Sequence, residues 1–347
     1  MRSRGVTVPV VVAVLLALSL LYVPSATWHR PKGHPSGVPL SPPQAANGSF
    51  ALLPAGITHY LLTGPAEGPL VPFLSYFDLF VVLVHGLLSS SKIFNNLTTA
   101  LNHQGYRTLS FDILSVFLWL SSAPNALYNE QLFVSQLANL LFKLRLNPKE
   151  GRFHLVGLSM GGAIATAFAH VYGDRVEKLI LIAPVGGGDP PVNLGLLGWL
   201  LKVPLLADVA WSLGGALPLL RSNAAAEFAV LEDVVDRDQL QQFRMKVEAG
   251  MMEQVQTSKD YLSALFCTVK DFAFDGFGEM LKNVGTHPRK VLLLWGDKDY
   301  TVPYANSAVF RRAMPNADLV TIEGGNHYAI SLRAKEINEA IIAFLQE

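Results

Sequence analysis

The chain has 347 residues, and its 27 Lys and Arg side chains balance its 27 Asp and Glu side chains to a formal net charge of +0. A neutral chain without a cluster of basic residues lacks the attraction that nucleic acid binding requires, so nucleic acid is excluded as a partner. Cys267 is the only cysteine, which excludes an intramolecular disulfide bond and a metal site built on cysteines.

Residues 1–28 are predicted to be a signal anchor or a signal peptide. Arg2 and Arg4 precede an apolar run from 6 to 23, which at about eighteen residues lies between a signal-peptide core and a membrane span. No cleavage site is well marked, which favours an uncleaved anchor. We therefore expect a membrane-associated protein of the endoplasmic reticulum or secretory pathway, with a secreted or organellar protein as the alternative.

Residues 29–55 are rich in Pro, Gly, Ser and Asn and are predicted to be a linker. From 56 to 347, apolar strand-like runs alternate with segments of helical spacing. The predicted strands are 57–62, 79–84, 106–111, 153–158, 178–183, 291–295 and 318–322, and the predicted helices are 93–104, 128–144, 160–172, 307–313 and 334–345. This alternation predicts one α/β domain with a mostly parallel central sheet and helices on both faces.

The long stretch between residues 183 and 290 has little strand character, and we expect a helical cap at about 186–285. Its first part, 194–220, is almost uncharged and rich in Leu, Gly and Trp, whereas 227–259 is charged and helical in spacing. A cap with an apolar inner face favours acyl chains as ligands. The alternative is that these helices pack only on one another.

Ser159 lies in the sequence Gly157-Leu158-Ser159-Met160-Gly161, between a predicted strand and an Ala-rich predicted helix. Gly-x-Ser-x-Gly at such a junction is typical of a nucleophile elbow. Small neighbours leave the serine hydroxyl accessible on a sharp, strained turn, and the start of the helix directs backbone N–H groups at a developing oxyanion. The alternative is a serine that only caps the helix.

Two aspartates and one histidine follow later strands in the chain order that a Ser-Asp-His triad requires. Asp297 and Asp299 follow the predicted strand 291–295, and His327 follows 318–322. Both loops lie at the carboxyl ends of strands, where open α/β sheets place their sites. His327 is therefore the candidate base, and the two aspartates are the candidates for the acid that orients it.

Four motifs together resemble the lidded α/β-hydrolases related to monoacylglycerol lipases and meta-cleavage-product hydrolases. The resemblance extends from about residue 79 to the C-terminus. The motifs are Val84-His85-Gly86-Leu87, Gly157-Leu158-Ser159-Met160-Gly161, Trp295-Gly296-Asp297-Lys298-Asp299 and Gly324-Gly325-Asn326-His327.

The resemblance implies an α/β-hydrolase fold and a role for each motif residue. It implies Ser159 as the nucleophile, His327 as the base and Asp299 as the acid, with Asp297 in a structural role. It also implies that the backbone N–H groups of Leu87 and Met160 form the oxyanion hole, with His85 as a structural residue of the same loop.

Two segments depart from the pattern of these relatives. The stretch 71–80 intervenes before the segment Val81-Val82-Leu83-Val84-His85-Gly86, into which residues 64–70 would normally lead directly. The stretch 113–121 replaces a glycine-containing loop that in relatives follows the aspartate found here as Asp112. Both segments are short and apolar. Two interpretations remain open, namely membrane-facing elements or translated intron sequence.

Taken together, the sequence predicts a membrane-tethered serine hydrolase that cleaves a small-molecule carboxylic ester through an acyl-enzyme. The apolar segments favour an acyl lipid such as a monoacylglycerol as the substrate. No metal and no cofactor are expected. The alternatives are a short-chain carboxylesterase, a C–C bond hydrolase, and a non-catalytic binding protein with the same fold.

Overall fold

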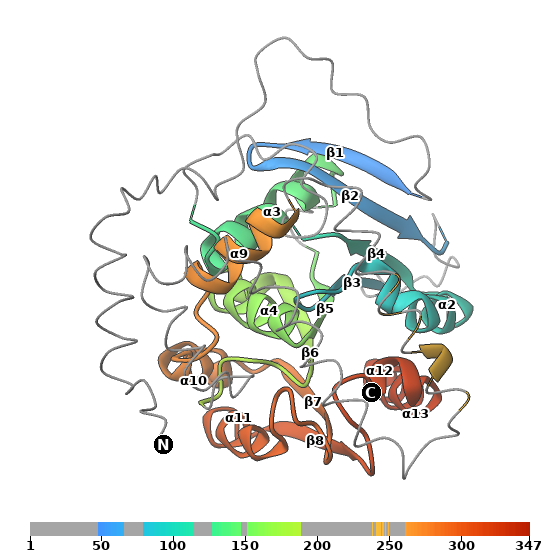
Figure 1. Cartoon of the computed structure of the whole chain (residues 1–347), viewed down its shortest axis with the longest axis vertical. Helices are drawn as coiled ribbons and strands as arrows, with labels where there is room; N and C mark the ends of the chain where they lie inside the picture. The colour runs from blue at the N-terminus through green and yellow to red at the C-terminus, as the bar shows by residue number, and fades with distance from the viewer. Residues whose placement is uncertain are drawn as a thin grey trace, which may run out of the picture.

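The computed structural model describes residues 48–65, 79–113, 127–146, 151–188 and 261–347, with parts of a helix between 238 and 249. Figure 1 shows the arrangement of their strands and helices. The strands are β1 (Ser49–Leu53), β2 (Gly56–Thr63), β3 (Phe80–Val84), β4 (Arg107–Phe111), β5 (Phe153–Leu158), β6 (Val176–Ile182), β7 (Lys290–Gly296) and β8 (Ala317–Ile322).

The described strands form one eight-stranded sheet in the order β1-β2-β4-β3-β5-β6-β7-β8. From β4 to β8 along this order all neighbours are parallel, whereas β1 pairs antiparallel with β2, and β2 antiparallel with β4. The prediction of a mostly parallel α/β sheet is confirmed. Because parallel neighbours end at the same edge, the loops that follow β3, β5, β7 and β8 all lie at one edge of the sheet.

Helices cover both faces of the sheet, and two separate apolar cores lie beneath them (Figure 1). The helices of one face are α3 (Glu130–Lys143), α4 (Met160–Val171), α9 (Tyr261–Asp271), α10 (Gly278–Thr286) and α11 (Ser307–Ala313), and those of the other are α2 (Asn95–His103), α12 (Ala329–Leu332) and α13 (Ala334–Gln346). Strand β3 shows why two covers are needed: Val82 and Val84 enter the first core, and Val81 and Leu83 the second.

The helix ends follow local chemistry. Helix α3 begins after Asn129, whose side-chain oxygen accepts a hydrogen bond from the Leu132 N–H at 3.2 Å. This cap satisfies one of the N–H groups that a helix start leaves without an intrahelical partner. At the other end of the chain, Lys178 Nζ donates to the carbonyls of Phe344 and Leu345, each at 2.9 Å, and so ties the last turn of α13 to β6.

One strand lies where a linker was predicted. Strand β1 (Ser49–Leu53) falls inside 29–55, pairs with β2, and buries Ala51 and Leu53 while Leu52 is 60% exposed. The alternation is that of an edge strand with one buried face. The strand is short, and Asn-Gly before it and Pro after it give the composition of a linker. The folded domain therefore begins before residue 56.

Several sequence predictions fall on residues outside the described part of the chain. These include the anchor 1–28, most of the two departing segments 71–80 and 113–121, and most of the cap at 186–285. Helices α9 and α10 lie within the predicted cap range, but its boundaries stay a prediction. Within the described residues, no helix combines the length and apolar character needed to cross a membrane.

Candidate active site

Ser159 stands at the turn between β5 and α4 with φ 55° and ψ −119°. Its backbone is fixed from both sides, because its N–H donates to the Ile182 carbonyl at 2.9 Å and its carbonyl accepts from the Val185 N–H at 3.2 Å. A non-glycine residue at positive φ costs about 1–3 kcal/mol. Its side chain makes no capping hydrogen bond to the helix, which argues against a role limited to capping.

The glycines around Ser159 allow two backbones to meet. A Cβ atom at Gly157 would lie 2.4 Å from the Gly161 carbonyl oxygen, and one at Gly161 would lie 2.1 Å from the Val84 carbonyl oxygen. A Cβ atom at Gly162 would lie 2.6 Å from Pro184 Cβ. The start of α4 therefore packs directly against β5 and the end of β3, and no side chain fits between them.

The structure brings His327 and Asp299 together. His327 Nδ1 lies 2.8 Å from Asp299 Oδ2, and the second carboxylate oxygen accepts from the Val302 N–H at 2.7 Å. The Asp299 side chain is fully buried, whereas 13% of the His327 side chain is exposed. Because Nδ1 donates to the carboxylate, the basic nitrogen of His327 is Nε2.

Asp297 takes a different part in the same loops. Its Oδ1 accepts from the Gly324 N–H at 2.7 Å, which joins the turn after β7 to the turn after β8. The two turns also touch through their backbones, since a Cβ atom at Gly296 would lie 2.1 Å from the Gly325 carbonyl oxygen. The contacts of Asp297 hold the loop that carries His327, as the sequence prediction of a structural role requires.

The loop after β3 lies against the nucleophile. A Cβ atom at Gly86 would lie 3.0 Å from Ser159 Cβ and 3.5 Å from Ser159 Oγ. Leu87 follows this close approach directly, and Met160 is the first residue of α4, where a helix leaves its N–H groups without intrahelical partners. Leu88 has φ 60°, a left-handed conformation that is strained for a branched side chain.

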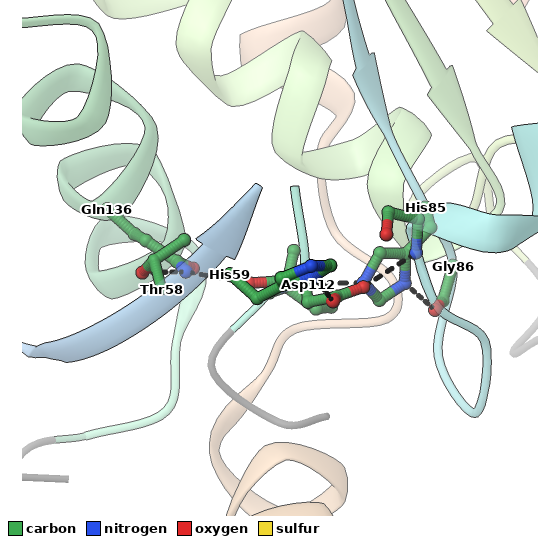
Figure 2. A network of polar contacts seen from close by, with 8 residues as sticks. Thr58, His59, His85, Gly86, Asp112 and Gln136 are labelled. Atoms are coloured by element: carbon green, nitrogen blue, oxygen red, sulfur yellow. Dashed lines mark hydrogen bonds and ion pairs between the residues drawn. The ribbon is translucent and has the colours of Figure 1, made fainter. Parts of the chain in front are cut away.

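A second histidine–carboxylate pair, His59 and Asp112, is linked to this loop through the backbone N–H of Ser91. His59 Nδ1 on β2 lies 2.6 Å from Asp112 Oδ2, at the end of β4, and both side chains are buried. Asp112 Oδ1 accepts from the Ser91 N–H, at the far end of the loop, at 2.7 Å. Figure 2 shows His59 and His85 on either side of Asp112.

His85 holds the near end of the same loop. Its Nε2 accepts from the Ile113 N–H at 3.0 Å, so its Nδ1 carries the proton and donates to the Gly86 carbonyl at 2.7 Å (Figure 2). Burial lowers the pKa of His85, although the charge of Asp112 and the Gly86 contact oppose this. His85 is therefore a neutral structural residue, as the resemblance implied.

The ionised form of Asp112 is favoured by its partners. Burial alone would raise the pKa of Asp112, but the hydrogen bonds from His59 and from the Ser91 N–H hold that pKa below its ordinary value. Gln136 of α3 extends the network, because its Nε2 donates to Thr58 Oγ1 at 2.9 Å and to the Asp112 carbonyl at 3.0 Å.

Sequence reasoning missed His59 and Gln136 and noted Asp112 only as the start of a departing loop. A usable signal was present in the predicted strand 57–62. Thr58 and His59 are adjacent polar residues in an otherwise apolar strand, and buried polar side chains require partners. Among the described residues, no cluster of His, Cys, Asp and Glu side chains could hold a metal ion.

Residues 81–340 match the alpha/beta hydrolase family, and the chain belongs to it. The chain is 28% identical over 202 residues to a 2-hydroxy-6-oxononadienedioate/2-hydroxy-6-oxononatrienedioate hydrolase of Burkholderia vietnamiensis, covering 56% of this chain and 63% of that relative. It thus spans less than two thirds of that relative's length. It is 27% identical over 307 residues to the sn-1-specific diacylglycerol lipase ABHD11 of Mus musculus, covering 85% of this chain and 86% of the lipase.

Solved structures give the same fold. The meta-cleavage product hydrolase from Pseudomonas fluorescens IP01 superposes with a TM-score of 0.62 at 19% identity, covering 86% of this chain and 97% of that one. The predicted α/β-hydrolase fold and the resemblance to lipases and meta-cleavage-product hydrolases are confirmed. The family match and the hydrolases among the relatives identify the chain as a hydrolase of this family.

Proposed function

We propose that the chain is a serine hydrolase that cleaves carboxylic esters through an acyl-enzyme. The observation that carries the proposal is the His327–Asp299 hydrogen bond at 2.8 Å, on loops that follow β8 and β7 at the sheet edge where Ser159 follows β5. The side chain of Ser159 makes no capping hydrogen bond to α4. Gly86 in van der Waals reach of Ser159 adds the loop that an oxyanion hole needs.

The proposed reaction has two halves, the formation of an acyl-enzyme on Ser159 and its hydrolysis, and His327 transfers a proton in both. Ser159 Oγ attacks the ester carbonyl while His327 Nε2 takes the hydroxyl proton, and His327 then gives that proton to the leaving alcohol. Water, activated by the same nitrogen, hydrolyses the acyl-enzyme. Asp299 orients the imidazole and stabilises its charged form. The N–H groups of Leu87 and Met160 bind the oxygen that becomes negative.

The nucleophile is tested by Ser159→Ala. We expect turnover of a p-nitrophenyl ester to fall by roughly 10⁶-fold, and labelling by a fluorophosphonate probe to disappear, with expression unchanged. Ser307→Ala, which removes a buried serine hydroxyl from α11, is the matched control and should keep both activities. Turnover retained in Ser159→Ala would refute the serine-hydrolase mechanism, and a wild-type chain that the probe does not label would favour a non-catalytic binding protein.

Hydrolysis of a C–C bond is the second candidate, because the Burkholderia relative is a hydrolase of 2-hydroxy-6-oxo acids. The same nucleophile and base can act on such a bond, so the site geometry does not separate the two reactions. Parallel assays on p-nitrophenyl butyrate and on a 2-hydroxy-6-oxohexa-2,4-dienoate separate them. A kcat/KM higher for the dienoate would replace the ester proposal.

An acyl lipid is the proposed ester substrate. Two facts support it: the mouse relative is a diacylglycerol lipase, and the sequence 194–220 is almost uncharged and apolar. Burial of four methylenes contributes about 3 kcal/mol, or roughly a hundredfold in binding if all four are buried. We therefore expect kcat/KM to rise from p-nitrophenyl butyrate to the octanoate. A steep fall with chain length would leave a short-chain carboxylesterase.

Membrane tethering through residues 1–28 is proposed on the apolar run from 6 to 23 alone. Deletion of residues 1–30 should move the protein from the membrane fraction to the soluble fraction and leave turnover of short soluble esters nearly unchanged. A full-length chain that fractionates as soluble would refute the tether without affecting the chemistry.

A further inference from the structure

Tyr261 is a buried side chain whose hydroxyl has no hydrogen-bond partner among the described residues. It lies at the start of α9, and only 1% of the residue is exposed. The hydroxyl of Tyr304, by contrast, lies 2.6 Å from Thr321 Oγ1 near the surface. A buried hydroxyl without a partner has lost its hydrogen bonds to water, and no hydrogen bond within the described fold compensates for that cost.

The position of Tyr261 connects it to the proposed active site. Together with Leu265 it forms a small apolar cluster, and Leu87 and Leu88 pack against that cluster. Leu87 carries a proposed oxyanion donor, and the preceding residue, Gly86, closely approaches Ser159. The cluster that contains Tyr261 therefore packs on the loop that approaches the nucleophile, and its apolar side chains offer the phenol no acceptor.

The chemistry of the phenol suits one role. Burial raises the pKa of Tyr261, so the hydroxyl stays protonated over the pH range in which an imidazole base works. A protonated phenol in apolar surroundings is a strong donor to an oxygen that gains negative charge, because a charged acceptor strengthens the hydrogen bond. Unsatisfied buried donors of this kind are uncommon in folded proteins and call for an explanation.

We propose that the Tyr261 hydroxyl donates a hydrogen bond to the ester carbonyl oxygen as it becomes an oxyanion, alongside the N–H groups of Leu87 and Met160. This inference rests on the proposed ester hydrolysis and adds a side-chain donor that the elbow and its glycines do not supply. No bond to Tyr261 forms or breaks, and its proton stays on the phenol. The donor is therefore used only when the tetrahedral intermediate forms, and it acts on kcat.

The test is Tyr261→Phe, which removes one oxygen and keeps the ring in the cluster on which Leu87 packs. On p-nitrophenyl butyrate we expect kcat to fall by about 10- to 100-fold, somewhat less than the loss of a single oxyanion donor in a known hydrolase, with KM within about twofold. Because no internal hydrogen bond is lost, Tm should stay the same or rise. The matched control is Tyr106→Phe. Tyr106 is buried in the core beneath α2 and α13, so this variant should keep kcat.

Each other outcome overturns the inference. Unchanged kcat in Tyr261→Phe, or an effect confined to KM, would show that the hydroxyl does not contact the oxyanion. A lowered Tm with unchanged kcat would show a purely structural hydroxyl. Fluorophosphonate labelling separates this from failure of the proposed function: an unlabelled wild-type chain refutes the serine hydrolase, whereas a labelled wild type with a fully active Tyr261→Phe variant refutes only the role of Tyr261.

Discussion

The His327–Asp299 pair and the His59–Asp112 pair differ in what surrounds the imidazole. His327 pairs with Asp299 at 2.8 Å on loops after β8 and β7, and His59 pairs with Asp112 at 2.6 Å within the antiparallel end of the sheet. The His327 side chain is 13% exposed and that of His59 is 5% exposed. A histidine–aspartate pair is therefore no signature of catalysis by itself, because its place relative to the nucleophile decides its role.

The His59–Asp112 pair contacts the loop after β3, which carries the proposed oxyanion donor Leu87. Asp112 holds the Ser91 N–H and His85 holds the Gly86 carbonyl, so the loop is fixed at both ends around Leu88. Strain at Leu88, with φ 60°, persists only where neighbouring contacts enforce it. One pair thus moves protons in the proposed reaction, and the other keeps a backbone donor in place.

The largest expected difference is catalytic. Asp299→Asn should lower kcat by about 10⁴-fold, because an amide cannot stabilise the imidazolium or fix the same tautomer, while thermal stability changes little. Asp297→Asn keeps the acceptor for Gly324 and should lower kcat by less than about tenfold. Steady-state kinetics on one ester measures both. If Asp297→Asn lowered kcat more than Asp299→Asn, then Asp297 and not Asp299 would be the acid of the triad.

The next largest effect is on stability. Asp112→Ala leaves His59 and the Ser91 N–H without their acceptor in a buried site, so the free energy of unfolding should fall by about 3–5 kcal/mol. Urea denaturation measures the loss, and Asp318→Ala, an exposed aspartate of β8, should change it by less than about 0.5 kcal/mol. If Asp112→Ala were as stable as this control, the hydrogen bonds of Asp112 would not contribute to the free energy of unfolding.

The smallest expected effect is on how the stability of the fold changes with pH. Since the pKa of His85 is lowered on folding, the unfolded chain binds a proton that the folded chain does not, and stability falls as pH drops below about 6.5. Asp112 has a lowered pKa, so its contribution is lost only as pH falls below about 4. Between pH 7 and 5, His85→Gln should therefore flatten the decline in urea midpoint. An unchanged slope would contradict a neutral, buried His85.

Local patterns predicted most of the sheet and the candidates Ser159 and His327, whereas Asp299 was preferred to Asp297 only through the family resemblance. Strand runs, helical spacing and the elbow glycines are read within short windows, and the order Ser159, Asp299, His327 follows from the fold class. The His59–Asp112 pair joins residues 53 positions apart through the register of β2 on β4, which no local window contains. The role proposed for Tyr261 depends likewise on which loop α9 reaches.

Strand β1 was missed for a different reason. Its five residues are bounded by turn-forming residues, and only pairing with β2 distinguishes such a segment from a linker. Edge strands of this length carry little sequence signal, because one face and one edge remain exposed. The tertiary partner, rather than the composition, decided the outcome there.

The close contacts at Gly157 and Gly161 bear on how alignments of this family are interpreted. Each glycine is required by a backbone oxygen within 2.4 Å of where its side chain would begin, and that requirement is independent of the serine between them. A library selected only for folding, built on Ser159→Ala, should therefore still retain glycine at both positions. Preservation of the two glycines in a distant sequence records the packing of a helix on a sheet, and evidence of activity has to come from the residue between them.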